Sequence, residues 1–180
     1  MRESLEQVNG KIKSYIEQIS IYSSDIINKY TQTLDDIMRD IKNEIIDKDN
    51  IDEDLLNHYF LSLTNALYFI GSQVEEVGFY DDVSKLNYKL AYNDAFIKNK
   101  SQDIGNSKKQ TNTDNQIAAE NNSIEEQVMN LIYSRSYKII KTKIDSGYEM
   151  VRTLSKIISS RQQEKQLSMM NKGGYNEFTR

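Results

Sequence analysis

Residues 123–170 read SIEEQVMNLIYSRSYKIIKTKIDSGYEMVRTLSKIISSRQQEKQLSMM, with no proline and a single glycine, Gly147. Apolar residues recur there at steps of three and four, at Ile140, Ile144, Tyr148, Val151, Leu154 and Ile158. This spacing predicts one long helix with a buried face. A helix of about 45 residues would extend over roughly 65–70 Å, so it must pack against other helices along its length.

The composition favours an all-α protein. The 180 residues include no proline, cysteine or tryptophan, and the strongest helix breaker is therefore absent. Without cysteine the chain has no disulfide, no thiol nucleophile and no thiolate zinc site. No run approaches the 18 or so apolar residues of a membrane span, and the N-terminus lacks the apolar core of a signal peptide. We therefore expect a cytoplasmic protein (in the host cell, if phage-encoded) with no membrane association; a place in a virion is also compatible.

Charge is distributed unevenly along the chain. Residues 1–77 hold 7 basic and 15 acidic side chains, a balance of −8, whereas residues 127–180 hold 10 and 4, a balance of +6. An acidic front and a basic back predict either attraction between the two ends, within or between subunits, or a basic end kept for a polyanion.

The N-terminal half predicts an acidic helix followed by an apolar one. Residues 1–49 form the first segment, with apolar residues at steps of three or four from Leu5 to Ile45. An acidic turn over Asp47–Asp54 follows, in which Asn50 or Asp52 would cap the next helix. Its spacing does not match a calcium-binding loop, so no metal site is expected. Residues 50–97 form an apolar helical core segment. Gly78, Asp81 and Asp82 predict a turn within it, between helices over 55–77 and 83–97. The first of these helices carries an apolar stripe that we expect to be at the centre of the core, at Leu55, Tyr59, Leu63, Ala66, Ile70 and Val74.

Residues 98–122 are polar and predict a flexible loop with a partly helical end over 117–120, since they cannot bury enough apolar surface to order themselves. This loop is either only a connection or a strand-binding element whose lysines contact phosphates, namely Lys98, Lys100, Lys108 and Lys109. The long basic helix over 123–170 and a flexible tail over 171–180 complete the chain. The predicted fold is an all-α, coiled-coil-like bundle of four main helices, with a polar loop before the last.

The last helix carries two groups of basic residues. Lys138, Lys141, Arg152 and Lys156 fall within about 60° on a helical wheel, opposite the apolar stripe. Asp145 and Glu149 lie among them, which also fits a solvated, salt-bridged face. Arg161 and Lys165 lie near the helix end, where a phosphate or an acidic neighbouring subunit could bind. Both groups, together with the four lysines of residues 98–122, are our candidate nucleic-acid-binding residues.

Enzyme signatures are missing. The chain has no phosphate-binding loop, no GxGxxG, no HExxH and no nucleophile elbow. With one histidine and no cysteine, the common acid–base and nucleophile arrangements are almost excluded. We expect no catalytic residues and no cofactor.

Three segments of the chain resemble segments of small helical proteins of tailed phages. They are YNDAF at 92–96, a polar segment with paired lysines, and a long helix containing LSKIISSRQQE at 154–164. Within that group the chain resembles the UvsY-type recombination mediators over about residues 84–167, including the pair Ser160-Arg161. The resemblance implies a non-enzymatic, ring-forming homo-oligomer that binds single-stranded DNA. It further implies a protein that helps a RecA-type recombinase to displace single-strand-binding protein, with Lys98, Lys100, Lys108, Lys109 and Arg161 on the DNA.

Two other hypotheses remain open. One is a virion structural or scaffold component with no nucleic-acid role. The other is a phage adaptor that binds a host protein through its acidic N-terminal half.

Overall fold

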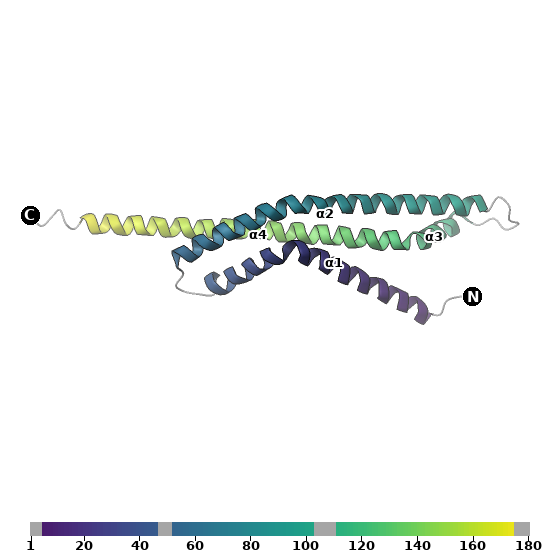
Figure 1. The fold of residues 1–180 in the computed structure, drawn as a ribbon, viewed down its shortest axis with the longest axis horizontal. Coiled ribbons are helices and arrows are strands. Elements are labelled where there is room, and N and C mark those ends of the chain that lie inside the picture. The colour runs from purple at the N-terminus through teal and green to yellow at the C-terminus, as the bar shows by residue number, and fades with distance from the viewer. Residues whose placement is uncertain (1–4, 47–51, 103–110, 175–180) are drawn as a thin grey trace, which may run out of the picture. The chain divides into compact units, whose positions relative to one another are not determined.

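The computed structural model describes residues 5–46, 52–102 and 111–174, and these are almost entirely helical. The helices are α1 (Leu5–Ile41), α2 (Glu53–Gln102), α3 (Asn112–Asn122) and α4 (Ile124–Gly174), and one π-helical turn over Lys42–Ile46 extends α1 (Figure 1). Within these ranges no residue is in a strand, and only Asp52, Thr111 and Ser123 lie outside a helix. The predicted all-α class with long helices is confirmed.

The chain forms two compact units, to which each of the three long helices contributes. Unit 1 consists of Met1–Tyr30 and Ser72–Lys141, and unit 2 of Thr31–Gly71 and Thr142–Arg180. In each unit, segments of α1, α2 and α4 pack together, because each presents an apolar stripe that must be covered by another helix.

In unit 1, α2 and α4 run antiparallel. Tyr80 stacks on Tyr133, and Asp81 is hydrogen-bonded to Ser134, and Figure 1 shows the two helices side by side over this part of the chain. Small polar groups join α1 to α4, since the Ser23 hydroxyl donates to the Ile132 carbonyl at 3.4 Å. Apolar side chains from all four helices are buried in this unit, including Ile27, Val77, Ala119, Val128, Ile132 and Ile140.

The core of unit 2 is built mainly from leucine and isoleucine, with Leu34, Ile41, Leu56, Leu63, Leu67 and Leu154 almost fully buried. The apolar stripe predicted for α2 is confirmed, as Tyr59, Leu63, Ala66 and Ile70 are all buried. On α4, Gly147 is buried, whereas Tyr148, which the spacing placed on the buried face, is 47% exposed. A Cβ on Gly147 would lie 2.7 Å from Leu67 Cδ2, so the helices approach too closely for a side chain there.

The predicted turn at Gly78, Asp81 and Asp82 is wrong, because α2 continues through these residues without a break. Tertiary contacts favour the helix over the turn that these residue types predict locally. A Cβ on Gly78 would lie 3.1 Å from Tyr137 Cε2, so the glycine allows the Tyr137 ring of α4 to approach. The side chain of Asp81 is buried and hydrogen-bonded, which makes it a packing residue.

The predicted polar loop over 98–122 is wrong at both of its ends, which are helical, although the helical stretch expected over 117–120 is present. Residues up to Gln102 continue α2, and Asn112–Asn122 form α3. A capping box starts α3, in which the Thr111 hydroxyl accepts from the Asp114 amide at 3.2 Å and the Asp114 carboxylate accepts from the Thr111 amide at 3.0 Å. These reciprocal hydrogen bonds start the helix despite the polar composition. Residues 103–110 lie outside the described ranges.

The start of α2 lies where the sequence predicts it, whereas α4 extends beyond its predicted end. Asp52 caps α2 as predicted, since its Oδ1 accepts from the Asp54 amide at 3.2 Å. Residues 47–51 of the acidic turn are outside the described part. The tail predicted over 171–180 is wrong for its first four residues, because α4 continues to Gly174, and residues 175–180 lie outside the described ranges. Of the helices described, none combines the length and apolar character needed to cross a membrane.

Candidate functional site

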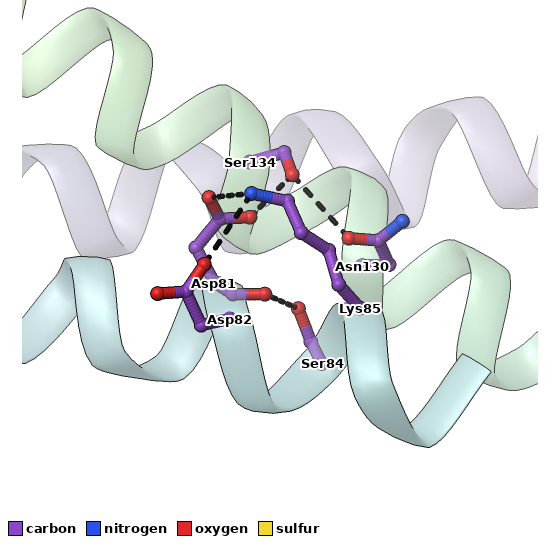
Figure 2. Close-up of polar contacts among 6 residues, drawn as sticks. All are labelled: Asp81, Asp82, Ser84, Lys85, Asn130 and Ser134. Atoms are coloured by element: carbon purple, nitrogen blue, oxygen red, sulfur yellow. Dashed lines mark hydrogen bonds and ion pairs between the residues drawn. The ribbon is translucent and has the colours of Figure 1, made fainter. Parts of the chain in front are cut away.

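A cluster of polar side chains joins α2 to α4 in unit 1. Its members are Asp81, Asp82, Ser84, Lys85, Asn130 and Ser134 (Figure 2). The Lys85 ammonium lies 2.5 Å from Asp81 Oδ2 and 3.7 Å from Asp82 Oδ1. From α4, the Ser134 hydroxyl donates to Asp81 Oδ1 and lies 3.3 Å from Asn130 Oδ1.

Asp81 is the centre of this cluster, and both of its carboxylate oxygens are engaged. Its side chain is only 6% exposed, and a buried carboxylate is costly unless donors surround it. The hydrogen bond to Asp81 raises the pKa of Lys85, although desolvation acts in the opposite direction. The Ser84 hydroxyl donates to the Asp81 carbonyl at 2.8 Å. Since the carboxylate is already satisfied, the arrangement fixes the position of α2 against α4 and provides no free base.

A cleft of about 400 Å³ lies beside this cluster. It is lined by Tyr80, Val83, Ser84 and Asn87 of α2 and by Glu125, Glu126, Met129 and Tyr133 of α4. The rings of Tyr80 and Tyr133 stack with centroids 5.6 Å apart and planes at 24°. The two glutamates are the charged side chains of this lining, so the cleft repels phosphate and is unsuited to a nucleic-acid backbone.

Lysines of α4 form ion pairs with acidic residues from the front of the chain. In unit 2, Lys143 Nζ lies 2.5 Å from Asp35 Oδ2 and 3.1 Å from Thr31 Oγ1, and the Thr31 hydroxyl donates to the same carboxylate at 3.0 Å. Lys165 forms a further ion pair with Glu53. The attraction between acidic front and basic back that the charge distribution predicted is therefore present within the chain.

Four of the predicted DNA-binding residues lie in unit 1. Lys98 and Lys100 are exposed in the last two turns of α2 and form no ion pair with another described residue. Lys138 and Lys141 are exposed on α4, where Lys141 Nζ lies over the Tyr137 ring, 5.2 Å from its centroid.

Four more lie in unit 2, on the second half of α4. Arg152 is ion-paired with Glu149, as the sequence suggested for this face, and Lys165 is ion-paired with Glu53. Lys156 is exposed and Arg161 is half-buried. The remaining two predicted residues, Lys108 and Lys109, lie outside the described ranges. The eight described residues are thus divided equally between the two units.

Sequence reasoning missed the Asp81 cluster. Asp81 was interpreted as a turn residue, and Ser134 and Asn130 were not singled out. One signal could have found them: serine stands on the inner side of the first half of α4 at Ser136, and just before the helix at Ser123, and both are fully buried. Small polar residues at such positions indicate hydrogen bonding between helices.

The described side chains include no group of three or more His, Cys, Asp or Glu residues suited to holding a metal ion. Comparisons with protein families, with curated proteins and with solved structures find no match.

Proposed function

We propose that this chain is a non-enzymatic recombination mediator that binds single-stranded DNA as a homo-oligomer and assists a RecA-type recombinase in the cytoplasm. The observation that carries the proposal is the combination of basic and aromatic side chains at the end of α2. Lys98 and Lys100 are exposed and have no acidic partner among the described residues. Proteins that bind single strands combine such charges with rings on which bases stack.

The aromatic residues stand at steps of four just before these lysines. Tyr92 and Phe96 stack with centroids 6.4 Å apart and planes at 12°, and Tyr88 lies 6.4 Å from Tyr92. All three are half-buried, so part of each ring remains accessible. Because few free lysines are available in one chain, useful affinity requires several copies acting on one strand.

The test is binding of fluorescently labelled oligo-dT, measured by anisotropy across a salt series. Affinity should fall steeply as salt rises, because binding releases counterions from the phosphates. The double variant Lys98→Ala/Lys100→Ala should bind more weakly and with a shallower salt dependence. Lys13→Ala/Lys42→Ala, which removes two other exposed lysines, is the matched control. Absence of binding by the wild-type protein at low salt would rule out the mediator.

The second candidate is a structural or scaffold protein of a virion. It is favoured by the ion pairs of Arg152 and Lys165, which neutralise part of the basic helix, and by the large apolar side chains exposed on α2. This candidate predicts no binding to oligo-dT and recovery of the protein in purified particles.

A further inference from the structure

The outward face of α2 in unit 1 carries a regular apolar pattern. Its positions alternate by four and three residues: Phe79, Val83, Leu86, Leu90, Asn93 and Ile97. This is the heptad spacing of a coiled-coil seam, with Val83, Leu90 and Ile97 at one kind of core position and Phe79, Leu86 and Asn93 at the other. The pattern covers 19 residues, about 28 Å of helix.

The described part of the chain leaves most of this seam uncovered, although Val83 is half-buried and lines the cleft next to Tyr133. Phe79 is 65% exposed, Leu86 56%, Leu90 53% and Ile97 61%. The buried residues of the same segment, Val77, Asp81 and Ser84, lie on the opposite side of the helix, against α4. A helix that is apolar on both sides is expected to be buried on both sides, so a second partner is missing from this face.

We propose that a second copy of this chain covers the seam, with α2 of one copy packed against α2 of the other as a parallel, in-register coiled coil. The inference rests on the self-association included in the proposed function and is independent of DNA binding. Because α2 is already helical and held by α4, the copies do not have to form the helix when they associate. The ordering cost that limits short isolated coiled coils is thereby reduced.

Charge complementarity identifies the occupant as a second copy. Lys89 and Asp94 flank the seam on its two sides, are exposed, and form no ion pair within the described chain. Lys89 and Asp94 are five residues apart in the sequence. In a parallel coiled coil, a flanking residue of one helix meets the residue five positions later on the other helix. Each Lys89 would therefore face Asp94 of the other copy, and the pair would form twice.

The same residues set the direction of the two helices. In an antiparallel arrangement centred on this seam, Lys89 would face Lys89 of the other copy and Asn93 would pack against Val83. In the parallel arrangement, Asn93 faces Asn93, and the two amides can hydrogen-bond to each other. A polar residue at a seam position selects the register in which it finds a polar partner.

The first experiment measures mass in solution by light scattering after gel filtration. We expect the wild-type chain to be at least a dimer, and Leu86→Glu/Leu90→Glu to reduce its mass by half, with helicity by circular dichroism unchanged. Leu61→Glu alters another exposed leucine of the same helix outside the seam and is the control, with no expected change. Lys89→Glu should weaken association and Lys89→Glu/Asp94→Lys should restore it, which tests the seam without changing an apolar residue.

The second experiment uses the absence of cysteine from the chain. Asn93→Cys should form a disulfide between copies under mild oxidation, whereas Val83→Cys mixed with Asn93→Cys should give no mixed disulfide. Crosslinking only in the mixture would overturn the parallel arrangement.

The outcomes separate this inference from the proposed function. An oligomer whose mass survives Leu86→Glu/Leu90→Glu and both charge variants overturns the seam and leaves self-association standing. A wild-type monomer overturns both. Loss of mass in the seam variant, with no binding of oligo-dT by the wild type, supports the seam and rejects the mediator.

Discussion

Asp81 on α2 accepts a hydrogen bond from the Ser134 hydroxyl on α4, 53 positions later in the chain. The carboxylate is buried, and its other oxygen is bound by Lys85 of its own helix. A residue type that usually ends or starts a helix therefore connects two helices in the middle of α2. Because the partners are specific, this contact defines how α2 and α4 are aligned within unit 1 better than the surrounding apolar contacts can.

Replacing Asp81 should destabilise the fold more than replacing its neighbour. Asp81→Ala removes the carboxylate that accepts the hydrogen bond of the partly buried Ser134 hydroxyl. We expect the free energy of unfolding to fall by about 1–3 kcal/mol. Asp82→Ala is the control, since the Asp82 side chain is 82% exposed, and should change stability by less than about 0.5 kcal/mol. Urea unfolding followed by circular dichroism measures both. Equal effects of the two substitutions would contradict the central role of Asp81.

Two glycines in the long helices should respond oppositely to alanine. Gly71→Ala should stabilise unit 2 by up to about 1 kcal/mol, because an added Cβ meets nothing within 4 Å and alanine is the better helix former. Gly147→Ala gains the same propensity, but its Cβ would lie 2.7 Å from Leu67 Cδ2 and 3.3 Å from Leu34 Cδ1 in a packed core. Overpacking costs about 1–3 kcal/mol, so we expect a net loss. Thermal unfolding of the two variants gives the comparison, and a higher midpoint for Gly147→Ala than for the wild type would show that unit 2 is loosely packed.

The start of α3 should depend on pH. Hydrogen bonds from the side chain and backbone of Thr111 lower the pKa of Asp114 below its usual 3.8. A lowered pKa means that the ionised carboxylate stabilises the folded helix above the unfolded pKa, and that this stabilisation is lost as the pH falls through the folded pKa. Carboxyl chemical shifts from an NMR titration should show the lowered pKa of Asp114. In Thr111→Val the pKa should move back towards 3.8; an unchanged titration would mean that the capping box does not hold Asp114.

The pair between Lys143 and Asp35 should contribute little stability. Their side chains are 32% and 42% exposed, and water screens such pairs strongly. A double-mutant cycle with Lys143→Met and Asp35→Asn should give a coupling energy below about 1 kcal/mol, decreasing further at high salt. A coupling energy of several kcal/mol that does not change with salt would indicate that the two side chains are more deeply buried than in the structure.

The amino-acid sequence alone determined the class of the fold. The chain has no proline, and its apolar residues recur at steps of three and four. These two features predict long helices, because each affects helix formation within one or two turns of the residue concerned. The acidic cap at Asp52 and the buried stripe containing Leu63 and Ile70 were predicted for the same reason, and the structure confirms them. Lys98 and Lys100, which we propose to bind DNA, were named from the sequence, but their exposure and their lack of an ion-pair partner in the described chain were not.

The tertiary structure alone decided which local signals prevail. Gly78 and Asp81 favour a turn by residue type, yet Tyr137 and Ser134 of a distant segment make the continuous helix favourable. The spacing of apolar residues also predicted that Tyr148 is buried. In the structure the neighbouring Gly147 faces the core instead, because Leu67 lies too close to the helix there for a side chain. Contacts between segments far apart in the chain determine these features. A short stretch of sequence contains only one partner of each contact, so its pattern cannot predict them.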